Sequence, residues 1–416
     1  MIYGCIGEHL PHSFSAEIHR MIGTVPYELK EIAPEDLDAF MRAKDFQGIN
    51  VTIPYKQAVI PWLDEISETA REIGAVNTVI QRKGKLYGTN TDAAGLTALL
   101  RRTGLMLSGK KVLIAGTGGT SKTALYVANR LGAREVLRLS RHPERFQGEG
   151  VLSYEAAAER HRNAEILINT TPCGMFPHAE EQPLDPGDFP ALEGVADVIY
   201  NPLRTRLVME ARKRGIPAEG GLYMLTAQAV RAAEVFRDRE EKEELIADIY
   251  RRLLRQKENI VLIGMPGCGK SSVASELVKL LGREAVDTDR LIAERAGCSI
   301  PEIFRLKGEK AFRDLESEVI AELSLRSGII IATGGGAVLR EENTERLKRN
   351  GRLFWLDRSP EALVPTADRP LADTREKMSA LYREREPVYR KAADERIPVS
   401  GTPEEAAVYI KGRWET

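Results

Sequence analysis

Two glycine-rich segments of this 416-residue chain have residue types and spacings that suit phosphate chemistry. Residues 264–271 read GMPGCGKS, which fits G-x-x-x-x-G-K-[ST], between a strand-like apolar run and an amphipathic stretch. In such a loop the backbone N–H groups surround phosphates, the lysine reaches the β- and γ-phosphates, and the serine hydroxyl binds Mg²⁺. The motif predicts a nucleoside triphosphate site, with a chance glycine-rich turn as the alternative. Its residues are Gly264, Gly267, Gly269, Lys270, Ser271 and Ser272.

The second segment, residues 112–121, reads VLIAGTGGTS and joins a strand-like run to a helix-like stretch. Gly116, Gly118 and Gly119 approximate the dinucleotide fingerprint, whose glycines admit a pyrophosphate at a helix N-terminus. Ser121 stands where the fingerprint has its third glycine, so a tight turn without a ligand is the alternative.

The end of the next strand-like run bears on which dinucleotide would bind. Residues 136–142 read VLRLSRH and contain no acidic residue to hold a ribose 2′-hydroxyl. They contain Ser140 and Arg141 instead, with Arg145 nearby, and arginine suits a 2′-phosphate. The pattern favours NADP over NAD, whereas a surface arginine with no ligand is the alternative.

Composition limits the classes of partner. The 60 basic and 61 acidic side chains nearly cancel, so no overall basic field attracts nucleic acid or an anionic membrane. Four widely separated cysteines, with no histidine at ligand spacing, predict neither a zinc site nor a disulfide framework. No signal peptide or membrane-length apolar run is visible, which predicts a cytoplasmic protein.

Short apolar runs alternate with amphipathic stretches, which predicts α/β domains with parallel sheets, and the length predicts two or three domains. Residues 237–258 are densely charged, with a thin apolar stripe. We expect a solvated linker helix there, at 241–257, and a domain boundary near residue 255. A partner-binding helix is the alternative.

Five short motifs follow the phosphate loop. They are VDTD at 286–289, FRDLE at 312–316, TGGGA at 333–337, DRPL at 368–371 and REPVY at 385–389. Each alone would suit a turn or a solvated charge cluster, but together, from residue 258 to the end, they resemble shikimate kinase. The resemblance implies a P-loop kinase domain with a parallel sheet, which phosphorylates a small carboxylic acid with three hydroxyl groups.

The resemblance also implies roles for individual residues. Arg313 and Arg385 would bind the substrate carboxylate, for which planar guanidinium groups are suited. Asp289 would hold the acceptor hydroxyl as the candidate base, and Asp287 with Ser271 would hold Mg²⁺. The remaining members would be Glu316 as a brace, Gly334, Gly335 and Gly336 against the substrate ring, and Arg369 at the transferred phosphoryl group.

The lid segment departs from the family pattern. Residues 362–368, which precede Arg369, are fewer than in the family and lack its second basic residue. We expect weak ATP binding with near-normal turnover, because contacts on the adenine side mostly contribute uniform binding.

Seven further motifs lie on both sides of the dinucleotide segment. The most distinctive are NVTIPYK at 50–56, GAVNT at 74–78 and NTD at 90–92. The others are HSFS at 12–15, NTTPCGM at 169–175, YNP at 200–202 and GGLYMLTAQ at 220–228. Together they resemble shikimate dehydrogenase, over residues 1 to about 236. The resemblance implies a substrate domain from residues 1–92 and 216–240, a Rossmann-like NADP domain at 93–215, and an active site in the cleft.

This resemblance assigns two residues to proton transfer. Lys56 would be the general acid/base in ketone reduction, and Asp92 would orient it and bind a substrate hydroxyl. An exposed lysine at a strand end is the alternative. The other substrate contacts would come from Ser13, Ser15, Thr52, Asn77, Tyr200 and Gln228. The NADP contacts would come from Gly116, Gly118, Gly119, Ser140, Arg141, Arg145, Asn169, Thr170, Gly221 and Met224.

Both resemblances involve one metabolite, since shikimate would leave one domain as product and enter the other as substrate. We expect a bifunctional enzyme of aromatic amino-acid biosynthesis that uses NADPH, ATP and Mg²⁺ to convert 3-dehydroshikimate into shikimate and then into shikimate 3-phosphate. One alternative is a quinate/shikimate dehydrogenase with broader cofactor use. The other is a regulatory or scaffolding protein in which one half binds ligands without turnover.

Overall fold

The computed structural model describes residues 1–10, 14–146, 148, 150–363 and 374–415. The chain divides into two compact units, Met1–Leu253 and Leu254–Thr416, close to the predicted boundary near residue 255. Within the described residues, no helix combines the length and the apolar composition that crossing a membrane requires.

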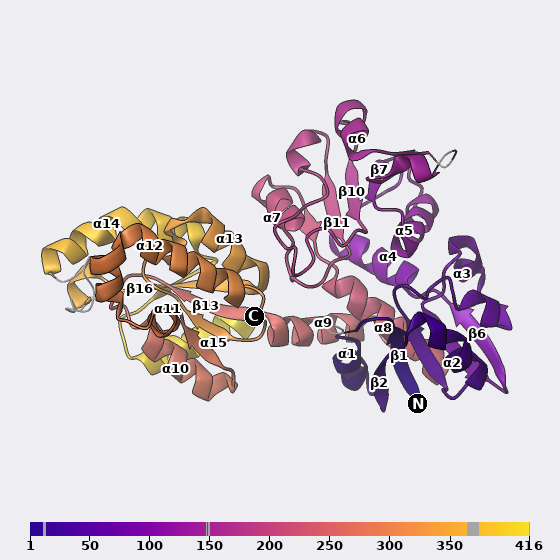
Figure 1. The fold of residues 1–416 in the computed structure, drawn as a ribbon, viewed down its shortest axis with the longest axis horizontal. Helices are drawn as coiled ribbons and strands as arrows, with labels where there is room; N and C mark the ends of the chain where they lie inside the picture. The colour runs from indigo at the N-terminus through magenta and orange to yellow at the C-terminus, as the bar shows by residue number, and fades with distance from the viewer. Residues whose placement is uncertain (11–13, 147, 149, 364–373, 416) are drawn as a thin grey trace. The chain divides into compact units, whose positions relative to one another are not determined.

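Unit 1 begins with a lobe built on a six-stranded mixed sheet, in the order β2-β1-β3-β5-β6-β4 (Figure 1). The central strands β1 and β3 are short apolar segments that are almost wholly buried, as expected for strands covered on both faces. The strands are β1 (Tyr3–Gly7), β2 (Tyr27–Glu31), β3 (Gly48–Val51), β4 (Glu65–Ile66), β5 (Thr78–Arg82) and β6 (Lys85–Thr89). The helices of this part of the chain are α1 (Ser15–Ile22), α2 (Leu37–Ala43) and α3 (Glu68–Ile73).

The second lobe of unit 1 has a fully parallel sheet in the order β12-β11-β10-β7-β8-β9. Counted from β7, this is the doubly wound order of dinucleotide-binding domains, with its switch point between β7 and β10. The strands are β7 (Lys111–Ala115), β8 (Glu135–Leu139), β9 (Val151–Leu152), β10 (Ile166–Asn169), β11 (Gly194–Asp197) and β12 (Ala218–Glu219). The helices are α4 (Asp92–Arg102), α5 (Gly119–Arg130), α6 (Tyr154–Arg160) and α7 (Arg206–Lys213).

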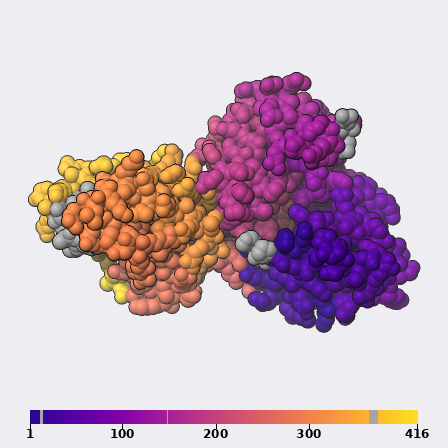
Figure 2. All heavy atoms as spheres, in the orientation of Figure 1, coloured from indigo at the N-terminus to yellow at the C-terminus, as the bar shows by residue number. Residues whose placement is uncertain are grey.

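Figure 2 shows the atoms of the first lobe in indigo and those of the second lobe in magenta as two distinct masses of this unit. The predicted return to the substrate domain at residue 216 is too early. Strand β12 at Ala218–Glu219 still pairs with β11, so the return begins after Glu219.

Helix α8 (Leu222–Arg237) then brings the chain back to the first lobe, where it packs against α1 and α4. The Phe236 ring stacks on Tyr3 with 5.2 Å between ring centroids. The ring also packs directly on the backbone of Gly48 and occupies the space that a side chain would need, because a Cβ added there would lie 2.5 Å from the ring. This helix therefore completes the core of the first lobe.

Helix α9 (Glu243–Lys257) occupies the predicted linker, but it is not solvated on all sides. Its apolar stripe is buried and consists of Ile246, Ile249, Tyr250 and Leu253. Tyr250 contacts Tyr223 edge-on, and the Arg102 guanidinium lies 4.4 Å from the centroid of its ring. The thin stripe that the sequence contains is thus used for packing on unit 1.

Unit 2 has a five-stranded parallel sheet in the order β14-β15-β13-β16-β17, with helices on both faces (Figure 1). The strands are β13 (Asn259–Ile263), β14 (Ala285–Asp287), β15 (Ile330–Ala332), β16 (Gly351–Asp357) and β17 (Glu395–Pro398). The helices are α10 (Lys270–Leu281), α11 (Thr288–Ala296), α12 (Ile300–Leu323), α13 (Glu341–Asn350), α14 (Arg375–Ala392) and α15 (Pro403–Glu415).

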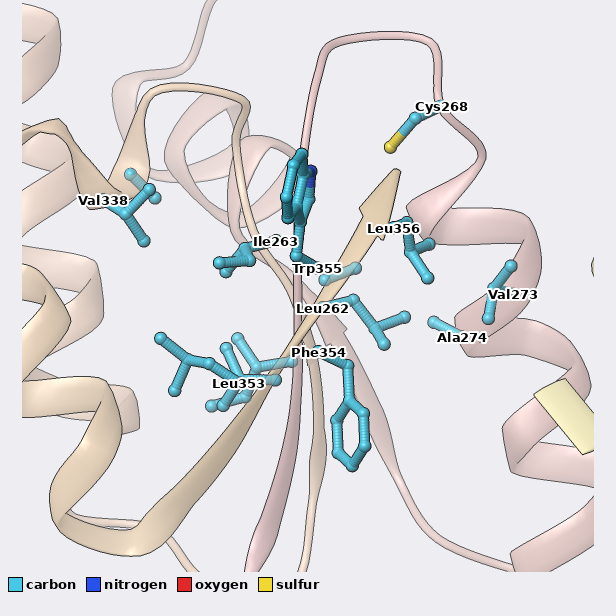
Figure 3. Close-up of a cluster of buried hydrophobic side chains, with 14 of the residues drawn as sticks. Leu262, Ile263, Cys268, Val273, Ala274, Val338, Leu353, Phe354, Trp355 and Leu356 are labelled. Atoms are coloured by element: carbon cyan, nitrogen blue, oxygen red, sulfur yellow. The ribbon is translucent and has the colours of Figure 1, made fainter. Parts of the chain in front are cut away.

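The core of unit 2 reaches directly under the phosphate loop (Figure 3). Phe354 and Trp355 point in opposite directions from β16, as successive strand residues do. Cys268 of the loop is buried, and a Cβ added at Gly264 would lie 3.1 Å from its Sγ. The apolar core therefore supports the loop from below.

Candidate active sites

A cavity of about 510 Å³ lies in unit 1, lined by residues of both lobes. The first lobe contributes the ends of β1 and β3, and the second contributes the loops that follow β10 and β11. The predicted substrate and cofactor residues that line it are Ser15, Thr52, Lys56, Asn77, Asp92, Thr170, Tyr200, Gly221, Met224 and Gln228. Residues 11–13 and 364–373, and with them the predicted Ser13 and Arg369, lie outside the described part of the chain.

Lys56 and Asp92 form the most strongly polar contact of this cavity. Lys56 Nζ donates to Asp92 Oδ2 over 2.6 Å, and both side chains are largely shielded from solvent. Asp92 is the first residue of α4, where the helix dipole favours a negative charge. The backbone of Lys56 is also fixed, because its carbonyl accepts from the Val76 N–H over 2.7 Å. The ammonium is therefore held in one place at the cavity wall.

Asn77 extends this contact into a network. Its Nδ2 donates to Asp92 Oδ1 over 2.9 Å and to Thr91 Oγ1 over 3.0 Å, and lies 3.4 Å from Gln228 Oε1. Its Oδ1 accepts from the Thr91 N–H over 2.7 Å. Segments far apart in the sequence, including α8, are thus joined by one side chain.

The cavity contains three further polar side chains: Cys5 and Tyr200, which remain uncharged at neutral pH, and Asn50, which the sequence analysis did not assign to the site. Burial raises the pKa of Cys5 to about 12, although Lys56 opposes this, and burial raises the pKa of Tyr200 to about 12. Asn50 also lines the cavity, and it accepts from Tyr27 Oη over 2.7 Å. Sequence reasoning did not assign Asn50 a role, although it begins the NVTIPYK motif.

The predicted dinucleotide loop follows β7 at the switch point. Gly116 has φ 108° and lies close to Thr170, because a Cβ there would be 2.8 Å from Thr170 Oγ1. Ser121 replaces the third fingerprint glycine and donates its hydroxyl to the Gly116 carbonyl over 2.7 Å, which stabilises the same turn. Gly118 and Gly119 have open space where side chains would be, so a ligand can approach their backbone.

The other predicted NADP contacts differ in exposure. Arg141 and Arg145 are exposed after β8, and Ser140 is buried with its Oγ accepting from the His142 N–H. Asn169 is fully buried and is not among the residues that line the cavity, so its place among the NADP contacts stays a prediction. Its amide is used within the protein, because its Oδ1 accepts from the backbone and hydroxyl of Thr171 over 3.0 and 2.7 Å.

In unit 2 the phosphate loop runs from the end of β13 to the start of α10. Gly264, Gly267 and Gly269 have φ values of 142°, 80° and 100°, which favour glycine. Lys270 Nζ donates to the Gly264 and Met265 carbonyls, each over 2.9 Å. Ser272, the last predicted residue of the motif, is exposed on α10.

Ser271 and Asp287 form the candidate Mg²⁺ site. Ser271 Oγ donates to Asp287 Oδ2 over 2.5 Å, and Asp287 Oδ1 caps α11. Within the described residues no group of three His, Cys, Asp or Glu side chains is placed to hold a metal. One hydroxyl and one carboxylate nevertheless suit Mg²⁺ in a kinase, since this ion commonly uses one or two protein oxygens together with substrate phosphates.

The predicted acceptor-substrate residues of unit 2 converge on the Gly334–Gly336 segment. A Cβ at Gly334 would lie 2.5 Å from Asp289 Oδ1 and 2.7 Å from Glu316 Oε1, and one at Gly336 would clash with the Arg313 guanidinium. Arg385 Nη1 donates to the Gly335 carbonyl over 3.1 Å, and so does Tyr389 Oη. Side chains of α11, α12 and α14 thus surround a strip of bare backbone.

Charges in this cluster are strongly coupled. Arg313 Nη1 donates to Glu316 Oε2 over 2.8 Å, and Glu316 is fully buried. Burial raises the pKa of Glu316, although Arg313 opposes this. Thr288, which the sequence did not single out, accepts from the Gly334 N–H over 2.8 Å and fixes the strip from the first residue of α11. The cluster thus brings a carboxylate, Asp289, and a guanidinium group, Arg313, close to a glycine backbone that leaves no room for side chains.

These two sites define a class of protein. Unit 1 has a doubly wound lobe with a glycine loop at its switch point and a lysine–aspartate pair in the adjoining cavity, as expected of a nucleotide-dependent dehydrogenase. Unit 2 has a phosphate loop on a parallel sheet, as expected of a P-loop kinase. The chain is a dehydrogenase joined to a kinase.

Comparison with known proteins gives the families. Residues 5–79 match the substrate binding domain of shikimate dehydrogenase, and residues 266–413 match shikimate kinase. The shikimate dehydrogenase (NADP(+)) of Caldicellulosiruptor bescii is 37% identical over 253 residues, which cover 56% of this chain and 88% of that protein. The chain therefore belongs to the shikimate dehydrogenase family and carries a shikimate kinase domain after it, as both motif sets predicted.

Two solved structures resemble unit 1. Shikimate 5-dehydrogenase from Thermus thermophilus, in complex with NADP(H) and shikimate, has a TM-score of 0.54 and 30% identity, covering 61% of this chain and 99% of that chain. Quinate dehydrogenase from Corynebacterium glutamicum, in complex with NAD, has a TM-score of 0.55 and 27% identity, covering 61% and 98%.

Proposed function

We propose that unit 1 reduces 3-dehydroshikimate to shikimate with NADPH, and that unit 2 phosphorylates shikimate to shikimate 3-phosphate with ATP and Mg²⁺. The observation that carries the first half is the 2.6 Å contact between Lys56 and Asp92 on the cavity wall. The second half rests on the phosphate loop and on Arg313, Asp289 and the Gly334–Gly336 strip near one another. Two family matches that share one metabolite support the sequence of reactions.

When bound along the glycine loop after β7, NADPH would supply the hydride for reduction of the ketone carbon. Lys56 donates a proton from Nζ to the oxygen that becomes a hydroxyl, and then regains a proton from solvent. Asp92 keeps the ammonium oriented and offers its carboxylate to a neighbouring substrate hydroxyl. A positioned acid of this kind contributes about 10²–10⁴ in rate.

The other cavity residues would bind and orient the ring. Ser15, with Ser13, would bind the substrate carboxylate, whereas Thr52, Asn77 and Gln228 would bind hydroxyl groups. Tyr200 lines the cavity and would offer its phenolic hydroxyl as a hydrogen-bond donor or acceptor to the ring. Arg141, with Ser140 and Arg145, would select the 2′-phosphate of NADP, and Thr170, Gly221 and Met224 would contact the cofactor from the cavity side.

In the phosphorylation, Asp289 would accept the proton of the acceptor hydroxyl as its oxygen attacks the γ-phosphorus. Lys270 and Arg369 would neutralise charge on the phosphates, and Ser271 and Asp287 would hold Mg²⁺. Arg313 and Arg385 would bind the carboxylate of shikimate. Catalysis of this type consists mainly of positioning and charge stabilisation.

A coupled assay of the full-length chain tests both halves. With 3-dehydroshikimate, NADPH and ATP–Mg²⁺ we expect NADPH oxidation followed by formation of shikimate 3-phosphate. Omitting 3-dehydroshikimate and NADPH and adding shikimate should leave the second reaction intact. Failure of either reaction would refute the corresponding half, and loss of phosphorylation alone would favour a ligand-binding role for unit 2.

Quinate oxidation is the competing activity for unit 1, since a quinate dehydrogenase is among the structural relatives. We expect shikimate to be preferred over quinate and NADP over NAD in competition experiments. Comparable kcat/KM values for quinate with NAD would overturn this choice.

A further inference from the structure

Asp197, the last residue of β11, is a fully buried carboxylate that the reaction above does not use. Its oxygens accept three hydrogen bonds. Oδ1 accepts from Asn169 Nδ2 over 3.1 Å and from the Ile199 N–H over 3.0 Å, and Oδ2 accepts from Thr205 Oγ1 over 2.7 Å. Within the described residues Asp197 has no basic partner, so its bonds are all to neutral donors of the fold.

Each of these donors leads to a loop that lines the cavity. Asn169 ends β10, and its Oδ1 holds the backbone and hydroxyl of Thr171. The loop that it fixes contributes Thr170, Thr171, Pro172 and Met175 to the cavity wall. Ile199 belongs to the loop after β11, which contributes Val198, Ile199, Tyr200 and Asn201. Asp197 therefore ties both loops together beneath the wall.

The hydrogen bonds that start at Asp197 continue through Ile199 to Gly221, where the polypeptide returns to the first lobe. The Ile199 carbonyl accepts from the Gly221 N–H over 2.8 Å, and a Cβ at Gly221 would clash with the Val198 carbonyl. Helix α8 begins one residue later and carries Gln228 into the cavity. The position of the Ile199 backbone thus affects both the wall and the start of α8.

A carboxylate suits this position chemically. Three donors converge here: the side chains of Asn169 and Thr205 and the backbone N–H of Ile199. An ionised carboxylate suits them, because it accepts at both oxygens and donates at neither. A neutral amide retains one acceptor oxygen but presents an N–H₂ group to the third donor. Removal of the side chain would leave buried donors unpaired, which costs more than the hydrogen bonds contribute.

We propose that Asp197 is a positioning residue for the dehydrogenase site, which sets the distance between the loops after β10 and β11. This inference rests on the proposed function of unit 1. Misplacement of reacting groups by about 1 Å can cost about 10² in rate. Asp197→Ala should therefore lower kcat/KM for the dehydrogenase about 10²-fold, whereas Asp197→Asn should retain activity within about tenfold.

The experiment uses the full-length chain, whose kinase rate reports the concentration of the chain, while thermal unfolding of unit 1 reports whether the dehydrogenase half is folded. The dehydrogenase kcat and the KM values for NADPH and 3-dehydroshikimate are measured well below the unfolding midpoint. The matched control is Asp185→Ala, which removes a hydrogen-bonded but exposed carboxylate of the same lobe, outside the cavity lining. It should leave kcat/KM unchanged.

Thr205 provides a second, milder pair of variants. Thr205→Val removes the hydroxyl that donates to Asp197, and Thr205→Ser retains it. Both changes keep Asp197 in place, so the pair decides the question even where Asp197→Ala does not fold. We expect lower kcat/KM for the valine variant and near-normal values for the serine variant.

Unchanged kcat/KM in folded Asp197→Ala, or equal values for the two Thr205 variants, would overturn the inference and leave Asp197 a purely stabilising residue. A lower unfolding temperature with unchanged kcat/KM would have the same meaning. Absence of shikimate dehydrogenase activity in the unmutated chain would refute the proposed function instead.

Discussion

The two sites of this chain differ in how their charged groups are arranged. In unit 1, Lys56 and Asp92 pair on the wall of a cavity, and Asn77 holds the carboxylate from its other side. In unit 2, the Lys270 ammonium is bonded to two carbonyls of its own loop, and Ser271 is bonded to Asp287. The first arrangement can accept a ligand as it stands, whereas the second must exchange internal bonds for phosphate and Mg²⁺.

This difference predicts which kinetic parameter of each activity a substitution should change. A prearranged network positions the reacting groups before the substrate arrives, so a single deletion in unit 1 should reduce turnover directly. In unit 2, ligand binding competes with existing contacts, so changes that shift a partner should act mainly on binding. The following predictions test this contrast, from the largest expected effect to the smallest.

Lys56→Ala should lower dehydrogenase turnover about 10²–10⁴-fold, the usual contribution of a positioned acid. The kinase rate of the same chain should not change, because Lys56 belongs to unit 1. Steady-state assays of both reactions on one preparation give the comparison. Dehydrogenase turnover within a small factor of normal would show that another group carries the proton.

A fragment that ends at residue 240 should be less stable than one that ends at 257. The longer fragment retains Ile246, Ile249, Tyr250 and Leu253, and a fully buried apolar side chain contributes about 1.5–3 kcal/mol. We expect the free energy of unfolding to differ by at least about 3 kcal/mol in urea titrations. Equal stabilities would restore the interpretation of α9 as a solvated linker, with two fully separable units.

The pH dependence of stability should reveal Asp197. Burial raises its pKa from 3.8 to about 6, although hydrogen bonds from Ile199, Thr205 and Asn169 oppose this. A raised carboxyl pKa means that the folded state holds a proton that the unfolded state has lost between these pH values. The contribution of Asp197 to the free energy of unfolding should therefore fall by up to about 3 kcal/mol as the pH rises from 4 to 6, and it should not change further above pH 6.

Asp197→Asn isolates that contribution, because the amide does not titrate. The difference in unfolding free energy between the two proteins should change with pH only in that interval. A difference that is constant from pH 4 to 7 would mean that the carboxyl pKa in the folded protein is ordinary.

Gly336→Ala should impair the kinase through Arg313. The backbone of Gly336 has φ −112°, which alanine adopts freely, but the new Cβ would clash with the guanidinium. Overpacking of this kind costs about 1–3 kcal/mol, so we expect the KM for shikimate to rise about 10–100-fold. Gly412→Ala is the matched control, since open space surrounds that position. Impaired turnover with a normal KM would instead place Arg313 in the chemical step.

Arg141→Asp should change the choice of cofactor. A hydrogen bond to a charged group is worth about 1.5–3 kcal/mol, and Arg141 is exposed, so NADPH binding should weaken about tenfold while NADH binding is unchanged or improved. Arg160→Asp, another exposed arginine of the same lobe, serves as the control. Equal losses for both cofactors would assign Arg141 to folding.

The sequence predicted the elements whose residues lie close together along the chain. Both glycine loops and the alternation of strands and helices agree with the structure, because motif and local geometry coincide there. The contact between Lys56 and Asp92, which are 36 residues apart, was expected from the resemblance to a known family and not from a local pattern. The hydrogen bond between Asn169 and Asp197 was not predicted, because Asp197 is 28 residues away and becomes a neighbour of Asn169 only through the pairing of β10 with β11. Strand order of this kind cannot be derived from a local pattern.

Packing of α9 was missed for a different reason. Its charged residues dominate the composition, and one thin stripe of apolar side chains is compatible with either solvent or a partner surface. Only the placement of Tyr223 and Arg102 around Tyr250 decides between these possibilities. The return of the chain after Glu219 was misplaced similarly, since the two residues of β12 are too few to leave a pattern.

Helix α8 has a consequence for synthesis on the ribosome. In the first lobe, Gly48 and Tyr3 pack against Phe236 of α8. The strands that are synthesised first therefore cannot complete their packing until this much later helix has been translated. The second lobe, whose strands follow one another without such a gap, can fold during that interval as chains generally do domain by domain. The part of the chain made first is therefore completed after the lobe inserted into it, because its Phe236 contact is made last.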